Sequence, residues 1–256
     1  MSDGAGEGDA GARVVVVTGG SNGIGRAACL AFGRTGASVV VHFNSDRAAA
    51  EEVVAEVFAS GGRAIAVQAD VGEPAAVSAL FDRVRAFGGD RLDVLFNNAG
   101  IYPVADLQTL DVDEWDRVMA VNVRGPLLCS QAALALLRAS PSGRIINISS
   151  NTVFRVPPRT VAYTTSKAAV IGLTRALARE LGEARITVNC VIPSLIATDN
   201  AARVFGSAFA GTVASQAIAR PQDAQDLIEL VLFLASDGAR FITGQTINAD
   251  GGLVYR

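Results

Sequence analysis

The run Thr18-Gly19-Gly20-Ser21-Asn22-Gly23-Ile24-Gly25 decides the fold, because it stands between an apolar stretch, Arg13–Thr18, and the helix-forming Arg26-Ala27-Ala28. Glycines at such a junction permit a tight turn, close approach of the backbone to a pyrophosphate, and close packing of helix on strand. The helix that follows offers free N–H groups and a positive dipole end to phosphates. The spacing is Gly-x-x-x-Gly-x-Gly and not the more familiar Gly-x-Gly-x-x-Gly,. The run predicts a dinucleotide-binding turn, with a glycine-rich turn that binds no ligand as the alternative.

Outward from this turn, short apolar runs alternate with helical patterns along the whole chain. The candidate strands are Arg13–Thr18, Ser38–Phe43, Ala64–Gln68, Val94–Asn97, Arg144–Ser149, Thr187–Ile192 and Gln245–Asn248. The candidate helices are Gly25–Gly33, Arg47–Ser60, Glu73–Phe87, Asp111–Leu137, Tyr163–Leu181 and Gln222–Ala235. Such alternation indicates βαβ units. We therefore expect an α/β fold, a single Rossmann-type doubly wound parallel sheet of about seven strands with helices on both faces.

Length and charge narrow the class of protein. The 256 residues suffice for one large α/β domain, and a net charge of −3 gives no reason to expect nucleic acid as a partner,. No stretch approaches the roughly 20 apolar residues of a membrane span, so no membrane partner is expected. Residues 1–12 lack the regions of a signal peptide. We expect them to form a disordered tail before one catalytic domain at 13–256.

The cysteines and the single histidine limit the chemistry further. Cys29, Cys129 and Cys190 lie far apart in apolar surroundings, so they are expected to be reduced core residues in a cytoplasmic protein,. With His42 as the one histidine, neither a zinc site nor a Ser-His-Asp triad is expected,. The predicted chemistry uses no metal.

The one lysine of the chain, Lys167, stands four residues after Tyr163, whereas the other 21 basic residues are arginine. On a helix these two positions share a face. An ammonium close to a phenol lowers a pKa that is normally about 10, and such a tyrosine can act as a general acid or base. An exposed lysine beside a packing tyrosine is the alternative for the pair alone.

Together, Thr18 to Gly25, Asn97-Asn98-Ala99-Gly100, Asn122, Ser150, Tyr163 and Lys167 resemble the short-chain dehydrogenase/reductase family. The resemblance runs from about Arg13 to the C-terminus. Each motif is modest evidence by itself, but the combination is highly specific. It implies a nicotinamide-dependent oxidoreductase of about 250 residues.

The resemblance implies a catalytic role for four residues, Asn122, Ser150, Tyr163 and Lys167. Ser150 precedes Tyr163 by 13 residues, the family spacing, and its hydroxyl would hold the substrate carbonyl oxygen while Tyr163 transfers the proton. Lys167 would lower the pKa of Tyr163 and bind the nicotinamide ribose. Asn122 resembles the family asparagine whose helix distortion holds a relay water. A plain strand-end hydroxyl and a helix-face amide are the alternatives for Ser150 and Asn122.

The expected cofactor site collects residues from the carboxyl ends of several strands. Besides Tyr163 and Lys167 they are Gly19, Ser21, Asn22, Gly23, Ile24, Gly25, Asn44, Ser45, Asp70, Val71, Asn97, Ala99, Gly100, Pro193 and Thr198. The resemblance implies that Asp70 and Val71 contact the adenine and that Asn97 and Ala99 lie along the adenosine ribose. It also implies that Thr198 binds the nicotinamide carboxamide.

The choice of nicotinamide cofactor rests on the end of the second strand. An NAD-preferring fold places an acid there, whereas this chain has Phe43 and no carboxylate before Asp46. Asn44, Ser45 and Arg47 could bond a 2′-phosphate, so NADP(H) is favoured over NAD(H). Asn22, where NADP(H)-preferring relatives often have a basic residue, argues the other way.

On the substrate side we expect a lid near residues 194–220, since a long unpatterned segment in a compact domain is usually functional. Ser194 replaces the glycine that commonly follows proline in the family, which puts the local backbone path in doubt. The expected pocket walls are Tyr102, Thr152, Phe154, Leu195 and Phe205, with plain core packing as the alternative. No arginine or lysine is evidently placed to hold a substrate carboxylate, so an apolar or aromatic ketone or secondary alcohol fits best.

The leading hypothesis is an NADP(H)-linked oxidoreductase of small-molecule ketones and secondary alcohols. A 3-oxoacyl-carrier-protein reductase shares every motif and is the alternative within the class. A nicotinamide-binding sensor would typically have lost Tyr163 or Lys167. The resemblance also implies a homotetramer joined through Asp111–Leu137, Tyr163–Leu181 and the C-terminal strand.

Overall fold

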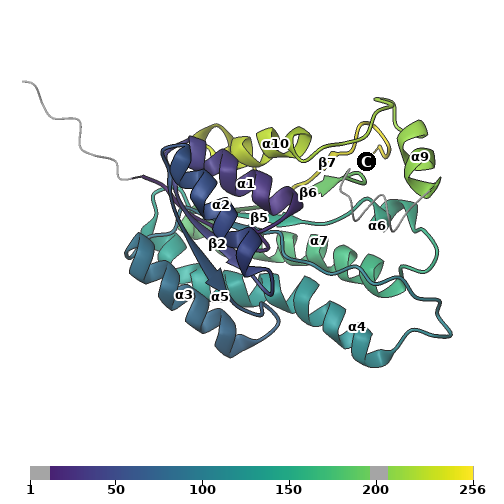
Figure 1. Cartoon of the computed structure of the whole chain (residues 1–256), viewed down its shortest axis with the longest axis horizontal. Helices are drawn as coiled ribbons and strands as arrows, with labels where there is room; N and C mark the ends of the chain where they lie inside the picture. The colour runs from purple at the N-terminus through teal and green to yellow at the C-terminus, as the bar shows by residue number, and fades with distance from the viewer. Residues whose placement is uncertain (1–11, 197–206, 256) are drawn as a thin grey trace, which may run out of the picture.

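The computed structural model describes residues 12–196 and 207–255, and it holds a parallel sheet of seven strands in the order β3-β2-β1-β4-β5-β6-β7 (Figure 1). The strands are β1 (Val14–Val17), β2 (Ser38–Phe43), β3 (Arg63–Gln68), β4 (Val94–Asn97), β5 (Arg144–Ile148), β6 (Thr187–Pro193) and β7 (Thr246–Ala249). The chain begins in the middle of the sheet, builds outward through β2 and β3, and returns to add β4 beside β1. The predicted doubly wound sheet is confirmed, and the order reverses between β1 and β4.

Helices cover both faces of this sheet (Figure 1). They are α1 (Gly23–Arg34), α2 (Arg47–Ala59), α3 (Pro74–Gly88), α4 (Val112–Met119), α5 (Gly125–Ala139), α6 (Thr152–Arg155), α7 (Val161–Leu181), α9 (Ser207–Ala214) and α10 (Gln225–Ala235), with short turns η1 (Ala120–Arg124), η2 (Gly182–Ala184) and η3 (Asp237–Ala239). One core cluster joins the sheet to α1, α2 and α10, and a second joins it to α3, α5 and α7.

Strand β1 shows why the apolar runs are continuous instead of alternating with polar residues. Val15 and Val17 enter the core beneath α1 and α2, while Val14 and Val16 enter the opposite core. Successive side chains of a strand point to opposite faces, and here both faces are covered by helices. All four valines are therefore buried.

The long predicted helix Asp111–Leu137 differs most from its expected form. The structure has α4, a π-helical turn η1 and α5 in direct succession. At the turn, the Gly125 amide bonds to the Ala120 carbonyl, five residues back,. By length and composition Val112–Ala139 could cross a membrane, but half of its apolar window is buried in the protein, and a core helix passes the same test.

Two short helices were absent from the sequence-based expectation. Helix α6 is a single turn after β5, and α9 lies within the segment expected as a lid. Both are alanine-, serine- or threonine-containing stretches without a periodic apolar face, so hydrophobic periodicity does not reveal them. The expected tail falls almost wholly at residues 1–11, outside the described residues.

Candidate active site

The glycine turn lies at the carboxyl end of β1, at the reversal in strand order. Gly19 and Gly23 have φ of 65° and 53°, a region that side chains rarely adopt,. A Cβ on Gly25 would overlap the Gly19 carbonyl oxygen, and one on Gly20 would come within 2.9 Å of the Cys29 sulfur. Glycine is thus required for three reasons: two positive φ angles, one closed turn and one contact with α1.

Side chains from neighbouring strands fix the shape of this turn. The amide nitrogen Nδ2 of Asn98 donates to the carbonyls of Thr18 and Gly19, both at 3.0 Å. The Thr18 hydroxyl accepts from the amides of Asn98 and Ala99 at 3.0 and 3.1 Å. The turn is therefore bonded to the end of β4. Of these, Thr18 and Asn98 belong to the quoted motifs but were not predicted as site residues.

His42, in β2, holds the turn from the other side. Its Nδ1 accepts from the Gly19 amide at 2.9 Å, and its Nε2 lies 3.0 Å from the Ala69 carbonyl at the end of β3. Because the amide can only donate and the carbonyl can only accept, the imidazole is neutral with its proton on Nε2. Burial lowers the pKa of His42, against the raising effects of the Ala69 bond and of Asp70.

The first turn of α1 fits the phosphates of a dinucleotide. Asn22 at its N-cap makes no capping hydrogen bond with its side chain, and the first turn has no acidic residue. Nothing within 4 Å would meet a Cβ on Gly23. The N–H groups at this helix end are left to bind an anion, and the dipole favours one. Ser21, Asn22, Gly23, Ile24 and Gly25 would hold the pyrophosphate.

The end of β2 has no carboxylate facing the ribose position. Phe43 is buried in the core beneath α2. Asp46 caps α2 by accepting from the Ala49 amide at 3.0 Å. Asn44 and Ser45 are exposed, and the exposed Arg47 lies over the Phe43 ring at 5.4 Å. This edge therefore presents neutral donors and a guanidinium.

At the end of β3, Asp70 is held by Arg117 of α4 through an ion pair of 2.8 Å. Partial burial raises the pKa of Asp70, but the hydrogen bonds from Arg117 and Gly72 outweigh it and hold the pKa low. Val71 is buried and contacts Gly125. The expected adenine-side pair thus consists of one charged group with a fixed orientation and one packing group.

Asn97 and Ala99 extend from β4 beside the turn. Asn97 donates through Nδ2 to Asn147 at 2.9 Å, and Asn147 donates to the Thr174 hydroxyl at 2.9 Å. The Asn97 side chain is thereby buried in a polar chain that joins β4, β5 and α7, which sequence reasoning did not foresee. Ala99 is placed by the bond of its amide to Thr18.

Ser150 and Tyr163 meet at a large cavity. Both side chains line the cavity, and the Ser150 hydroxyl lowers the pKa of the Tyr163 phenol. The neighbouring Ser149 donates instead to the Lys167 carbonyl at 2.8 Å, so its hydroxyl is occupied by α7. Both serines directly follow β5, so their position alone does not say which hydroxyl acts on the phenol. Because the Ser149 hydroxyl is bonded to α7, Ser150 is the serine that acts on Tyr163.

Lys167 differs from expectation in its effect on Tyr163. Its Nζ donates to the Ile148 carbonyl at 3.0 Å and lies 5.8 Å from the Tyr163 ring centroid. Burial raises the pKa of Tyr163, although the bond to Ser150 lowers it. Burial also lowers the pKa of Lys167 to about 8. The phenol therefore stays protonated at neutral pH, because burial of the hydroxyl dominates and the ammonium is directed at a backbone carbonyl.

Asn122 lies in the π-helical turn and is 1% exposed. Its Oδ1 accepts from the Ile101 amide, and its Nδ2 donates to the Ile101 carbonyl, each at 2.9 Å. Nδ2 also donates to Ser166 at 3.0 Å. The side chain thus ties the loop after β4 to α7 close to Tyr163. The expected helix distortion is present at this residue.

The cavity has a volume of about 990 Å³ and is lined by Gly100, Ser150, Tyr163 and Lys167 among others. Of the expected pocket walls, Tyr102, Thr152 and Leu195 line it. The Tyr102 ring meets that of Tyr163 edge-on, with centroids 6.1 Å apart. Phe154 is a correction: it packs on the core cluster of Val170 and Ile192 beneath α7. The two remaining predicted positions, Thr198 and Phe205, lie outside the described residues.

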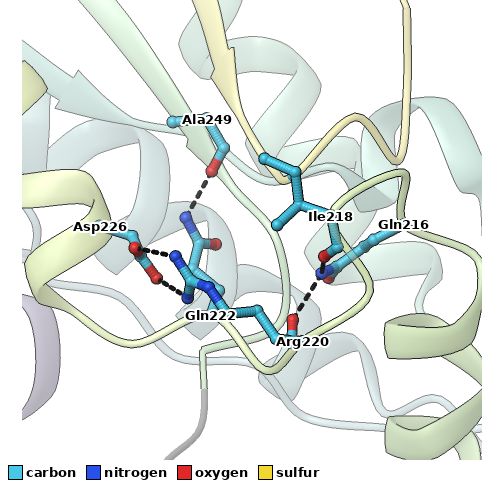
Figure 2. A pocket seen from close by; sticks show the side chains of 7 residues that line it. Gln216, Ile218, Arg220, Gln222, Asp226 and Ala249 are labelled. Atoms are coloured by element: carbon cyan, nitrogen blue, oxygen red, sulfur yellow. Dashed lines mark hydrogen bonds and ion pairs between the residues drawn. The ribbon is translucent and has the colours of Figure 1, made fainter.

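Ser194, where relatives commonly have glycine, is fastened at the base of the expected lid. Its amide donates to Gln222 at 2.7 Å and its hydroxyl to Gln216 at 2.7 Å. Figure 2 shows both glutamines around a small cavity of about 190 Å³, with Gln222 bonded to the Ala249 carbonyl and Gln216 to that of Arg220. Arg220 is in turn paired with Asp226. The backbone after Pro193 is therefore held by side-chain hydrogen bonds, whereas a glycine at position 194 would lack the hydroxyl that makes one of them.

This fold and site define a nicotinamide-dependent oxidoreductase, and comparison with known proteins agrees. A family model described as "Enoyl-(Acyl carrier protein) reductase" matches residues 19–254. A "Short-chain type dehydrogenase/reductase" from Picea abies is 44% identical over 95% of this chain and 93% of its own length. A "3-oxoacyl-[acyl-carrier-protein] reductase" from Synechocystis is 40% identical over 95% and 97%.

Solved structures place the chain in the same family. An angucycline C-6 ketoreductase, LanV, with bound NADP is 36% identical with a TM-score of 0.87, covering 94% of this chain and 95% of that one. An acetoin dehydrogenase from Enterobacter cloacae is 35% identical with a TM-score of 0.85, covering 95% and 96%. The chain belongs to the short-chain dehydrogenase/reductase family. It is an oxidoreductase of CH–OH and C=O groups in small molecules.

Proposed function

We propose that this chain reduces a small-molecule ketone to a secondary alcohol, with NADPH as the hydride donor. The observation that carries the proposal is that Ser150, Tyr163 and Lys167 line one cavity of about 990 Å³. Two hydroxyls directed at one carbonyl oxygen stabilise the alkoxide that forms as hydride arrives. The nicotinamide supplies that hydride, and the protein orients it and manages one proton.

The direction of reaction is supported by the pKa of Tyr163. Reduction requires a phenol that is protonated before the reaction and donates its proton to oxygen. Burial raises the pKa of Tyr163, which keeps it in this form at neutral pH,. Alcohol oxidation would instead need a phenolate.

The preference for NADPH is supported by the end of β2. Phe43 is buried where an acid would repel a 2′-phosphate, and Asp46 is engaged as the cap of α2. Arg47 makes only long, solvent-exposed contacts, to Glu51 and Gln68, each at 3.5 Å, so it can turn with the exposed Asn44 and Ser45 to bond that phosphate,. A solved relative, LanV, has NADP bound.

The experiment is a titration of the purified protein with NADPH and NADH, followed by nicotinamide fluorescence, and then turnover of ketones with the preferred cofactor. We expect tighter binding of NADPH and ketone-dependent oxidation of it. Preference for NADH would overturn the assignment of Asn44, Ser45 and Arg47. Binding without turnover of any ketone would overturn the reaction.

A 3-oxoacyl-carrier-protein reductase is the second candidate, favoured by the relative from Synechocystis that bears this name. Turnover of 3-oxoacyl thioesters in strong preference to free ketones would select it.

We further infer a homotetramer in the cytoplasm. Its proposed contacts are α4 with α5, α7, and β7, and the three described cysteines are buried and free, in keeping with a reducing compartment,. Light scattering tests the assembly, and a monomeric mass would refute it.

A further inference from the structure

We propose that Arg155 binds an anionic group of the substrate at the mouth of the catalytic cavity, so that the preferred substrate is a ketone with an apolar body and a carboxylate. This inference rests on the proposed ketone reduction and narrows its substrate class. It also changes the expectation from sequence, in which no cationic side chain was evidently placed for a substrate carboxylate.

The charge of the cavity wall is the first observation. Arg155, Arg159 and Lys167 all line the cavity. None of its lining residues within the described ranges 12–196 and 207–255 is an aspartate or glutamate. A wall with cations and no described carboxylate attracts anions.

Of these three cations, Arg155 is the one whose charge faces neither a backbone carbonyl nor a carboxylate among the described residues. Lys167 is buried and donates to the Ile148 carbonyl. Arg159 faces Asp106 at 3.4 Å. Arg155 donates through Nη1 to the Thr212 hydroxyl at 3.0 Å, and none of the described residues pairs its guanidinium with a carboxylate. A guanidinium has five N–H donors in a planar fork that matches a carboxylate, so most remain for a ligand.

The backbone around Arg155 is stiff, which gives the guanidinium a defined place. Helix α6 ends at Arg155 after one turn, and Val156 follows with φ 45° and ψ 62°. This left-handed conformation is a marked outlier for a β-branched residue. Pro157 and Pro158 fix φ at the next two positions, and Arg159 again has a positive φ of 65°,. Strained non-glycine residues of this kind cluster at functional sites.

The bond to Thr212 shows that the Arg155 guanidinium lies on the cavity wall. Thr212 belongs to α9, lines the same cavity and is 8% exposed. The bond thus joins α6, which begins two residues after Ser150, to α9, and Figure 1 shows both helices at the same end of the molecule. A substrate whose carbonyl lies at Ser150 and Tyr163 would extend its far end toward Arg155. The apolar walls between them, such as Val156 and Leu195, suit an apolar body.

The test uses two matched series of unbranched ketones, oxo acids with increasing separation between carbonyl and carboxylate and their methyl esters, each reduced with NADPH. For the wild type we expect kcat/KM to favour the acid over its ester by about 10- to 100-fold at one chain length, as for a charge-assisted hydrogen bond. This preference should fall as ionic strength rises.

The variants then assign that preference. Arg155→Gln should abolish it, and Arg155→Lys should keep part of it because the charge remains without the planar fork. Thr212→Val removes the link to α9 and leaves the cation, so it should retain the preference. If Thr212→Val and Arg155→Gln lose it equally, the role of Arg155 is structural and the proposal fails. Arg83→Gln, an exposed arginine on α3, is the control for a change of net charge.

Three negative results can be told apart. Normal reduction of ketones with the same acid-to-ester ratio in wild type and Arg155→Gln at every length would overturn the role of Arg155 alone. Absence of ketone reduction with either nicotinamide would overturn the proposed function, and this inference with it. Preference for a neutral 3-oxoacyl thioester over every oxo acid would overturn the carboxylate and favour a carrier-bound substrate.

Discussion

Replacement of His42 should separate two hydrogen bonds that one imidazole makes, and only one of them should matter for cofactor binding. Nδ1 accepts from Gly19 in the glycine turn, and Nε2 donates to Ala69 at the end of β3. An asparagine oxygen can occupy the place of Nδ1, whereas a glutamine nitrogen reaches the place of Nε2. His42→Asn therefore keeps the bond to the turn, and His42→Gln keeps the bond to β3.

The magnitudes follow from the burial of the site. His42 is 1% exposed, so a backbone group that loses its partner there finds no water. Each such group costs about 1–3 kcal/mol, and both single-bond variants should lose about that much stability. His42→Leu leaves both backbone groups without a partner and should lower the free energy of unfolding by about 2–5 kcal/mol. Affinity for NADPH should fall about tenfold or more in His42→Gln and His42→Leu, since about 1.4 kcal/mol of distortion at the turn suffices for that.

Acid should act on the wild type as the glutamine variant does. Protonated imidazole has only donors, so it opposes the Gly19 amide. Because the folded pKa is lowered relative to about 6.5 in the unfolded chain, the stability contributed by neutral His42 is complete above about pH 6.5 and is lost as pH falls through the folded pKa,. Affinity for NADPH should decline over the same window.

The assay is nicotinamide fluorescence titration from about pH 8 to about pH 5, with urea unfolding at each pH. His42→Asn is the internal control, because titration of the cofactor's own phosphate affects it equally and it has no imidazole. Equal affinity of the asparagine and glutamine variants would refute the reasoning. So would an acid-induced loss of affinity that persists unchanged in His42→Asn.

Three further predictions concern the catalytic residues and the base of the lid. Tyr163→Phe should lower kcat by at least about 10³-fold and leave the dissociation constant of NADPH unchanged, since the lost group is the proton donor; most activity retained would remove Tyr163 from this role. Lys167→Met should be inactive yet about 1–3 kcal/mol more stable at pH 7, because burial depresses the pKa of Lys167 to about 8 and makes its charge costly,. That gain should shrink as pH rises from about 8 to 10.5, where the folded lysine becomes neutral, and a pH-independent gain in urea unfolding would contradict it. Ser194→Ala should cost about 1–2 kcal/mol by removing the bond to Gln216, and should raise KM more than it changes kcat,; an unaltered KM would show that this bond does not position the substrate wall.

The sheet could be predicted because its evidence is local and repeated. Each strand is a short apolar run buried on both faces, and β1 supplies valines to both cores,. Spacing likewise predicts a role for the glycine turn, Ser150, Tyr163 and Lys167, and the last three do line one cavity. What periodicity could not show are single-turn features. Helix α6 is too short to have a period, and the π-helical turn at Asn122 interrupts a helix whose apolar pattern continues across it.

The positions of charges in the site were the least predictable part. A lysine four residues after a tyrosine predicts that both side chains lie on one face of a helix, and both do line the same cavity. The direction of the ammonium depends on the Ile148 carbonyl at the end of β5, and the pKa of Tyr163 depends on how deeply its hydroxyl is buried. Both are set by elements distant in sequence.

Arg155 and His42 are two further polar residues whose positions the sequence did not predict, and both carry a signal that could have been used. Neither belongs to a recognised motif, and among 21 arginines nothing in the sequence singles out Arg155. Its signal is a combination of features: an arginine that ends a one-turn helix shortly after Ser150, followed by Pro157-Pro158, which cannot continue a helix,. His42 carries a comparable signal, a lone imidazole that follows three valines in β2 and stands one residue before the position on which the predicted cofactor preference rests. A polar group placed in a core must find partners, and at the carboxyl end of a parallel sheet those partners are the turns that form the binding site. Unexplained polar residues near strand ends should therefore be tested as supports of the site before they are dismissed as packing.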